Sequence, residues 1–287
     1  MKCVDNKMKI LRNKRILVCG KGGSGKSSVV SLLGDELIKQ RYKVILLDAD
    51  ASNPGGLFRL LTDKKNAPEP LIDFFGGRSK VTCPSDDPAA LTRIDDKLAV
   101  TEFAVKLSEI PKQYSFKKNN LILFQIGKIQ GACEGCDGPM SKVARDFIVK
   151  DDFVTLIDME AGIEHFGRGV EENADVIIIV VDPTFESFLI AEIIVKMSSY
   201  FEEKNVCAIL NKVDSKETDS IMQNALKKRG VNYLGSIKYD KEIYKSGFEG
   251  GIIPQCEAGK SIVPIVNKLE KLLAAKENIK INELTEG

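Results

Sequence analysis

The sequence predicts a single α/β domain, a doubly wound and mostly parallel sheet with flanking helices, and three observations support this fold class. Short apolar runs alternate with helical patterns from residue 15 to residue 275, as expected for strands joined by crossover helices. A glycine-rich turn joins the first strand to the first helix. Neither a linker nor an internal repeat interrupts the pattern. We therefore expect one domain over residues 1–287, with a loosely held tail over about 276–287.

Length and composition are ordinary for a globular protein. The 287 residues are 43% hydrophobic and 29% charged, and the net charge of +1 gives no reason to expect nucleic-acid or acidic-membrane binding. The longest apolar run, residues 176–181, is too short to span a bilayer, and the first fourteen residues are not a secretory signal. Seven cysteines, an odd number, do not indicate a disulfide framework, so the reducing cytoplasm is the expected compartment.

The turn after the first strand, residues 15–18, has the spacing of a phosphate-binding loop, and a helical pattern over 29–37 follows it. Backbone N–H groups and the dipole at the start of this helix would attract phosphate. Lys26 would supply charge to the β/γ-phosphates, and the Ser27 hydroxyl would coordinate Mg²⁺. The alternative is a glycine-rich turn without a ligand. The predicted nucleotide-binding residues of the loop are Gly20, Lys21, Gly22, Gly23, Ser24, Gly25, Lys26, Ser27 and Ser28.

A second lysine, Lys21, follows the first glycine of the loop. With this lysine the chain resembles the MinD/ParA/nitrogenase-iron-protein class of P-loop ATPases, which have a deviant Walker A loop. The resemblance implies that Lys21 crosses a dimer interface and touches ATP in the partner subunit. It therefore predicts a nucleotide-dependent homodimer that hydrolyses ATP to ADP and phosphate. The alternative is a solvated loop charge.

The second predicted strand, residues 43–48, ends in a pair of acids, Asp48 and Asp50. Carboxylates at the C-terminal end of a parallel strand lie in the crevice where such sheets bind ligands. The resemblance implies that this segment is switch I, with Asp50 orienting or deprotonating the attacking water and Asp48 near Mg²⁺. Asp50 would then join Lys21 and Lys26 as the catalytic residues. Two exposed turn aspartates are the alternative.

Residues 62–120 carry five prolines and no recognisable motif. Residues 98–100 and 121–124 have the apolar character of strands and would flank an insertion. We expect irregular structure and partner-facing surface here.

Another acid ends the predicted strand 153–158. Asp158 has the Walker B position, where its carboxylate would accept hydrogen bonds from a Mg²⁺-bound water and from Ser27. Residues 159–169 follow, where the ATPase class places switch II, and the resemblance implies that Gly162 senses the γ-phosphate.

The second half of the chain continues the alternation of strands and helices. Asn211 ends one strand, and the resemblance implies that its amide reads the adenine edge. Asp240 falls where the class has a second loop near the base. A capping or turn role is the alternative for both residues. The remaining predicted elements are helices at 140–149, 185–200, 221–229 and 262–275, and strands at 176–181, 206–210 and 233–237.

The pair Cys133 and Cys136 distinguishes this chain from a generic ATPase. Two thiolates at this spacing can hold one soft ion, such as Ni²⁺ or Zn²⁺, or one edge of a [4Fe–4S] cluster. Such sites normally need four ligands, and the single histidine, His165, cannot complete the set. A symmetric dimer would bring two pairs together. A redox-active thiol pair and two unrelated turn cysteines are the alternatives.

The other cysteines carry no such pattern. Cys19 and Cys207 fall in predicted strands and are expected in the core. The isolated cysteines, to which we assign no role, are Cys3, Cys83 and Cys256.

Residues 158–169 look like the switch II signature of the CooC ATPases, which are nickel-insertion maturation factors for carbon monoxide dehydrogenase. The resemblance extends from the Cys19 loop through Asn211 and implies that Glu164 and His165 respond to nucleotide state. For His165 a surface or half-buried turn residue is the alternative. The CooC family carries its metal-binding thiols as Cys-x-Cys, whereas this chain has Cys-x-x-Cys. The wider spacing leaves the identity of the metal open.

The leading hypothesis is therefore an ATP-driven metallochaperone that inserts nickel into a carbon monoxide dehydrogenase-like client and uses a metal site shared between subunits. The alternative is a redox ATPase carrying [4Fe–4S], as in the nitrogenase iron protein, although no cysteine lies between Asp158 and Cys207 to match that protein's ligands. A partitioning or positioning ATPase is disfavoured, because the chain has neither a basic excess nor a basic amphipathic C-terminal helix.

Overall fold

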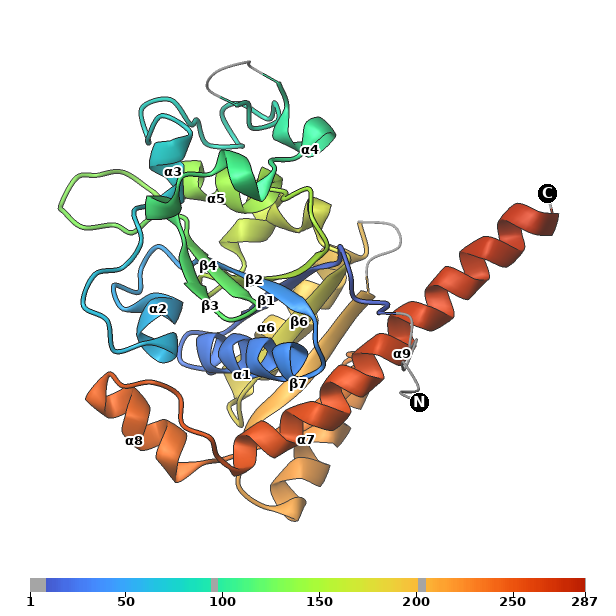
Figure 1. Ribbon diagram of the computed structural model, residues 1–287. Coiled ribbons are helices and arrows are strands. Elements are labelled where there is room, and N and C mark those ends of the chain that lie inside the picture. The colour runs from blue at the N-terminus through green and yellow to red at the C-terminus, as the bar shows by residue number, and fades with distance from the viewer. Residues whose placement is uncertain (1–8, 94–97, 201–204, 287) are drawn as a thin grey trace, which may run out of the picture.

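Eight strands of the computed structural model, which describes residues 9–93, 98–200 and 205–286, form one sheet (Figure 1). Their order is β3-β4-β2-β5-β1-β6-β7-β8. Seven strands run parallel, and β3 at one edge pairs antiparallel with β4. The predicted fold class is confirmed. The strands are β1 (Arg15–Gly20), β2 (Lys43–Ala49), β3 (Phe116–Lys118), β4 (Leu121–Gln125), β5 (Phe153–Met159), β6 (Val176–Val181), β7 (Asn205–Val213) and β8 (Tyr233–Lys238).

Helices cover both faces of this sheet (Figure 1). On one face α1 and α9 bury Val29 and Ile265 against the strands, and on the other α5 and α6 bury Val143 and Ala191. Because every residue of β1, β4, β5 and β6 is buried, these strands read as continuous apolar runs. The helices are α1 (Lys26–Lys39), α2 (Gly56–Leu61), α3 (Leu71–Phe74), α4 (Val100–Phe103), α5 (Gly138–Asp146), α6 (Phe185–Ser198), α7 (Lys216–Lys228), α8 (Lys241–Glu249) and α9 (Glu257–Glu286).

The segment between β2 and β4 is largely irregular, as predicted, apart from short helices and β3. The predicted strand at residues 98–100 is wrong. Val100 begins helix α4, and Ala99 makes only an isolated bridge to Thr92. The outer edge of β4 is occupied by β3, so residues 98–100 have no free sheet edge to join there. Two 3₁₀ turns complete this segment, η1 (Leu107–Glu109) and η2 (Lys112–Tyr114).

Helix α9 is longer than predicted. It begins at Glu257 and its backbone stays helical to Glu286, whereas the sequence predicts a helix over 262–275. Its last part extends beyond the end of the sheet in Figure 1. Each helix within the described residues is too short or too polar to cross a lipid bilayer.

The strand register brings the candidate residues to one end of the sheet. Val18 of β1 and Asp48 of β2 both lie opposite Asp158 of β5. The turn after β1 and the acids of β2 and β5 therefore meet at the carboxyl ends of the parallel strands, where open α/β sheets bind ligands.

Candidate nucleotide site and adjoining cysteine loop

The glycine-rich turn has a backbone that only glycine tolerates at two points. Gly20 has a φ of 141°, and a Cβ there would lie 2.5 Å from the Val180 carbonyl oxygen. Gly25, the N-cap of α1, has a φ of 96°, and a Cβ there would strike the Asn211 amide. Since no side chain fills these positions, the backbone amides at the start of α1 stay available to an anion.

The two lysines of the loop have different surroundings. The Lys26 side chain is buried, 6% exposed, and its Nζ lies 3.4 Å from the Lys21 carbonyl oxygen. The Lys21 Nζ lies 3.2 Å from Thr184 Oγ1 and 3.6 Å from Asp182 Oδ2, just beyond β6. Within one protomer Lys21 is therefore held by its own chain. Its predicted reach to a partner's nucleotide requires release from these contacts and remains a prediction.

Asp158 is a buried acid that fits a Mg²⁺ ion. Its side chain is 0% exposed, and neither carboxylate oxygen has a hydrogen-bond partner among the described residues. Burial, and next the charge of Asp48, raise the pKa of Asp158 to about 7, while Ser27 and Lys26 oppose the rise. A buried carboxylate without a partner is costly, and a cation between Asp158 and the half-buried Ser27 would remove that cost.

Lys128, which the sequence analysis missed, binds the other acid of this cluster. Its Nζ lies 2.8 Å from Asp48 Oδ1 and 2.6 Å from the Asp50 carbonyl oxygen. The second oxygen of Asp48 accepts from the Leu57 N–H at 3.0 Å. Burial raises the pKa of Asp48, and Lys128 opposes the rise. Both oxygens of Asp48 thus already have protein donors, so its predicted association with Mg²⁺ remains untested.

Asp50 and Gly162, the predicted water-orienting residue and phosphate sensor, lie on the two segments beside the loop. The Asp50 carboxylate accepts from Ser52 Oγ at 2.7 Å and from the Ser52 N–H at 3.1 Å. Gly162, with a φ of 100°, donates its N–H to the Gly20 carbonyl at 3.3 Å. The segment predicted as switch II therefore begins against the first residue of the glycine-rich loop, and the role of Gly162 as a γ-phosphate sensor remains a prediction.

His165 is a core residue of switch II. It lies in the 3₁₀ turn η3 (Glu164–Arg168), is 3% exposed and packs on the Phe166 ring at a centroid distance of 4.7 Å. Burial, followed by the charges of Lys26 and Arg168, lowers the pKa of His165 to about 4. The imidazole is therefore neutral at neutral pH. His165 is buried, which differs from the surface or half-buried position weighed for it.

Asn211 and Lys212 of β7 donate hydrogen bonds to backbone carbonyls of the glycine-rich loop. Asn211 Nδ2 donates to the Ser24 carbonyl at 2.8 Å, and Lys212 Nζ donates to the Gly23 carbonyl. One donor of Asn211 is thus occupied by the protein, and its adenine contact remains a prediction. Asp240 caps α8, accepting from the Glu242 N–H at 2.9 Å, which is the capping role weighed for it.

The loop between β4 and α5, residues 127–137, which we call the cysteine loop, contacts both switch segments. At its start Lys128 binds Asp48 and Asp50. At its end Asp137 pairs with Arg168 of η3, and Arg168 also donates to Ser141 at 3.3 Å. Cys133 and Cys136 lie between these two anchors, and both are exposed. No three potential metal ligands within the described residues already form a binding cluster.

Of the remaining cysteines in the described residues, Cys19 and Cys207 are buried, and Cys83 and Cys256 are partly buried. Cys19 and Cys207 are 0% and 2% exposed, as predicted for core residues, and burial raises the pKa of each thiol. Cys3 lies outside the described residues. Cys83 lies next to Cys136, although nothing in their spacing indicates this.

The chain is similar to known nucleotide-binding proteins in both sequence and fold. A family model described as the CobQ/CobB/MinD/ParA nucleotide binding domain matches residues 16–253. An uncharacterised ATP-binding protein of Methanocaldococcus jannaschii is 36% identical over 260 residues, 88% of this chain and 100% of the relative. The carbon monoxide dehydrogenase accessory protein CooC of Rhodospirillum rubrum is 30% identical over 237 residues, 80% of this chain and 85% of the relative. The cell division ATPase MinD of Pyrococcus furiosus has the same fold, with a TM-score of 0.61, 19% identity and coverage of 91% and 99%.

Proposed function

The chain belongs to the CobQ/CobB/MinD/ParA family of nucleotide-binding domains, and from that premise we propose that it is an ATP-hydrolysing metallochaperone that works as a homodimer. ATP binding closes two protomers, and Lys21 of each reaches the nucleotide of the other. Closure changes the cysteine loop, so that Cys133 and Cys136 of both subunits share the cargo metal. Hydrolysis to ADP and phosphate reopens the dimer.

The observation that carries this proposal is the attachment of the cysteine loop at both ends. Lys128 ties its start to the Asp48 carboxylate and to the Asp50 carbonyl, in the segment proposed as switch I. Arg168 ties its end, Asp137, to switch II. A movement of either switch on ATP binding or hydrolysis therefore pulls on the segment that contains both thiols. Coupling between a nucleotide site and a metal site requires an element with two discrete arrangements. In this proposal the two switch segments are that element.

The nucleotide chemistry follows from the residues around the loop. Lys26 binds the β/γ-phosphates, Asn211 contacts the base, and Asp50 orients the attacking water. Ser27 and Asp158 are the residues that would hold Mg²⁺, which supplies charge neutralisation at the phosphates when bound. The partnerless carboxylate of Asp158 supports this assignment.

The client is proposed from the similarity to CooC of Rhodospirillum rubrum, a carbon monoxide dehydrogenase accessory protein. Nickel is the cargo implied by that similarity, and an enzyme like carbon monoxide dehydrogenase is the client. Soft thiolate ligands suit such an ion.

Metal analysis of protein purified without oxygen tests the proposal. We expect tight binding of nickel or zinc, loss of the ion in Cys133→Ala, and dimerisation with Mg²⁺ and a non-hydrolysable ATP analogue. Cys256→Ala, outside the cysteine loop, is the matched control and should keep the metal. A broad iron–sulfur absorption band, with iron and sulfide at about one cluster per dimer, would contradict metal delivery and establish the redox alternative.

A further inference from the structure

Cys83 and Cys136, far apart in the sequence, meet at the first residue of α5. A Cβ on Gly138 would lie 2.5 Å from Cys83 Sγ and 3.3 Å from Cys136 Sγ. The two sulfurs are therefore separated by no more than the sum of these distances, about 5.8 Å. Metal–sulfur bonds of about 2.3 Å in a tetrahedral site hold sulfurs roughly 3.8 Å apart. To bind one ion, the two sulfurs would therefore have to approach each other by at most about 2 Å.

The absence of a side chain on Gly138 keeps this space open. The same virtual Cβ would also lie 2.7 Å from Cys83 Cβ, so any larger residue would push the Cys83 turn away from α5. Glycine at the first position of α5 thus permits the close approach of the two thiols.

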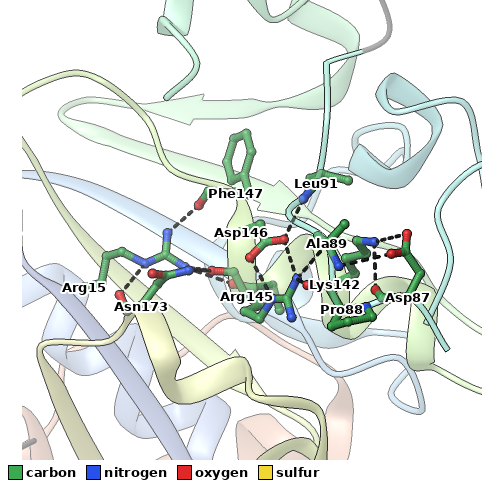
Figure 2. A network of polar contacts seen from close by, with 11 residues as sticks. Arg15, Asp87, Pro88, Ala89, Leu91, Lys142, Arg145, Asp146, Phe147 and Asn173 are labelled. Atoms are coloured by element: carbon green, nitrogen blue, oxygen red, sulfur yellow. Dashed lines mark hydrogen bonds and ion pairs between the residues drawn. The ribbon is translucent and has the colours of Figure 1, made fainter. Parts of the chain in front are cut away.

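The turn that contains Cys83 is fixed against α5 by polar contacts, most of which Figure 2 shows. The Asp87 N–H donates to the Cys83 carbonyl at 2.9 Å. Lys142 of α5, with a side chain only 5% exposed, donates to the Asp87 carboxylate at 2.9 Å. Arg145 donates to the carbonyls of the two residues after Asp87, at 3.2 and 3.1 Å. These partly buried contacts place Cys83 at this end of α5.

Cys136, the other partner of this contact, is also held by residues of the insertion. Arg78 donates to the Cys136 carbonyl, and it pairs with Glu134 at 3.3 Å. Arg168 pairs with Asp137 on the opposite side. The segment from Arg78 to Cys83 and the cysteine loop therefore form one unit, with two guanidinium groups close to where thiolate charge would collect.

We infer that Cys83 is a third ligand, so that the nucleotide-free protomer holds one soft metal ion between Cys83, Cys133 and Cys136. The inference rests on the proposed function, which assigns the metal to the last two. Three thiolates leave the fourth position of a tetrahedral ion open, as in sites that exchange a ligand. In the closed dimer the partner's thiols reach this open position, and the ion passes from three ligands in one chain to the shared site.

Cobalt titration of the reduced, nucleotide-free chain tests this inference, because thiolate-to-cobalt charge-transfer bands grow with the number of thiolate ligands. We expect one Co²⁺ per protomer with the intensity of three thiolates. Cys83→Ser should reduce the intensity by about one third and weaken Co²⁺ binding by more than about 100-fold, beyond the 10- to 100-fold typical of an outer-shell change. Gly138→Ala fills the space between the sulfurs, so it should also reduce the band intensity and weaken Co²⁺ binding.

Two controls separate this inference from the proposed function. Cys256→Ser and Gly247→Ala, a helical glycine with nothing within 4 Å of its virtual Cβ, should leave Co²⁺ binding unchanged, and circular dichroism should show that all variants fold. If Cys83→Ser binds Co²⁺ with the affinity and band intensity of the wild type, and Cys133→Ala loses the ion, the third ligand is excluded and the proposed site shared in the closed dimer is unaffected. If the wild type binds no Co²⁺ without nucleotide, the third ligand is excluded, and if it binds none with Mg²⁺ and an ATP analogue either, the proposed function is overturned as well.

Discussion

Lys128 and Asp48, 80 residues apart in the sequence, form a buried ion pair with side chains 5% and 1% exposed. Removing one partner of such a pair leaves an uncompensated charge and typically costs 3–5 kcal/mol. We therefore expect Lys128→Met, which keeps most of the apolar stem, to lower the free energy of unfolding by about 3 kcal/mol. Urea denaturation of the nucleotide-free protein measures this change.

The double variant Lys128→Met with Asp48→Asn separates the charge from the packing. Since it removes both charges, it should recover most of the lost stability. If the single and double variants lose the same free energy of unfolding, the apolar stem of Lys128, and not its ion pair with Asp48, stabilises the loop.

His165, the only histidine of the chain, should make stability dependent on pH. Its pKa is lowered to about 4 in the folded protein, against about 6.5 when unfolded. Between these values the unfolded chain binds more protons, so stability is lost as the pH falls from about 6.5 to about 4. The loss from this residue is about 3 kcal/mol.

His165→Phe removes the titrating group beside Phe166, so its stability should fall by about 3 kcal/mol less than that of the wild type between pH 7 and pH 4. Proton NMR of the single imidazole gives the pKa directly. A midpoint near 6.5 would contradict its burial.

At the scale of elements, the contact between η3 and the start of α5 should transmit the nucleotide state. Arg168→Gln removes the charge that holds Asp137 and leaves the glycine-rich loop intact. We expect the ratio of metal affinities with and without an ATP analogue to fall toward one, while ATP binding is retained. Isothermal titration with Co²⁺ in both states measures this ratio.

Arg78→Gln is the matched control for that variant. It frees the cysteine loop from the insertion and leaves the η3 contact in place. Metal affinity should fall in both nucleotide states, with their ratio unchanged. If the two arginine variants behave alike, η3 has no special part in the coupling.

The sequence predicted the seven parallel strands of the sheet and missed the edge strand β3 and the short helices, which depend on tertiary contact. Strands such as β5 and β6 are buried on both faces, and an unbroken apolar run is a strong signal. Helices α3 and α4 have four residues each, too few for a periodic pattern. Helix α7 starts at Lys216, earlier than predicted, because the Ser215 side chain caps it by accepting from the Thr218 N–H.

The candidate site was predicted where its residues share a motif or follow a strand. Gly20 to Ser28, Asp48, Asp50 and Asp158 are of this kind, and the register brings them together. The contacts of Lys128 and Cys83 could not be predicted in this way. A single lysine or cysteine in a loop belongs to no motif, so the sequence does not indicate which residue it contacts. Only the fold of residues 62–120 brings Cys83 to Cys136.

At the scale of the whole molecule, Lys21 should decide whether two protomers associate. Lys21→Ala removes the charge expected on the partner's nucleotide and retains Lys26. We expect ATP binding to persist, ATP-dependent dimerisation to be lost, and hydrolysis to fall on the order of 100-fold, the typical effect of removing one preorganised donor. Light scattering with a non-hydrolysable analogue and a phosphate-release assay measure both effects.

Lys227→Ala, an exposed lysine of α7, serves as the comparison and should dimerise normally. A Lys21→Ala protein that still dimerises with the ATP analogue would exclude the interface proposed for this lysine.

The short antiparallel strand β3 has a consequence for assembly. An open sheet edge offers unpaired backbone groups to another chain, and natural proteins block such edges with short strands and lysines. Here the edge strand has three residues, and both Lys117 and Lys118 are exposed. A second copy therefore finds no template for extending the sheet, and fibre growth along that edge is suppressed. Even at high protein concentration, that edge should not compete with the proposed pairing through the nucleotide face.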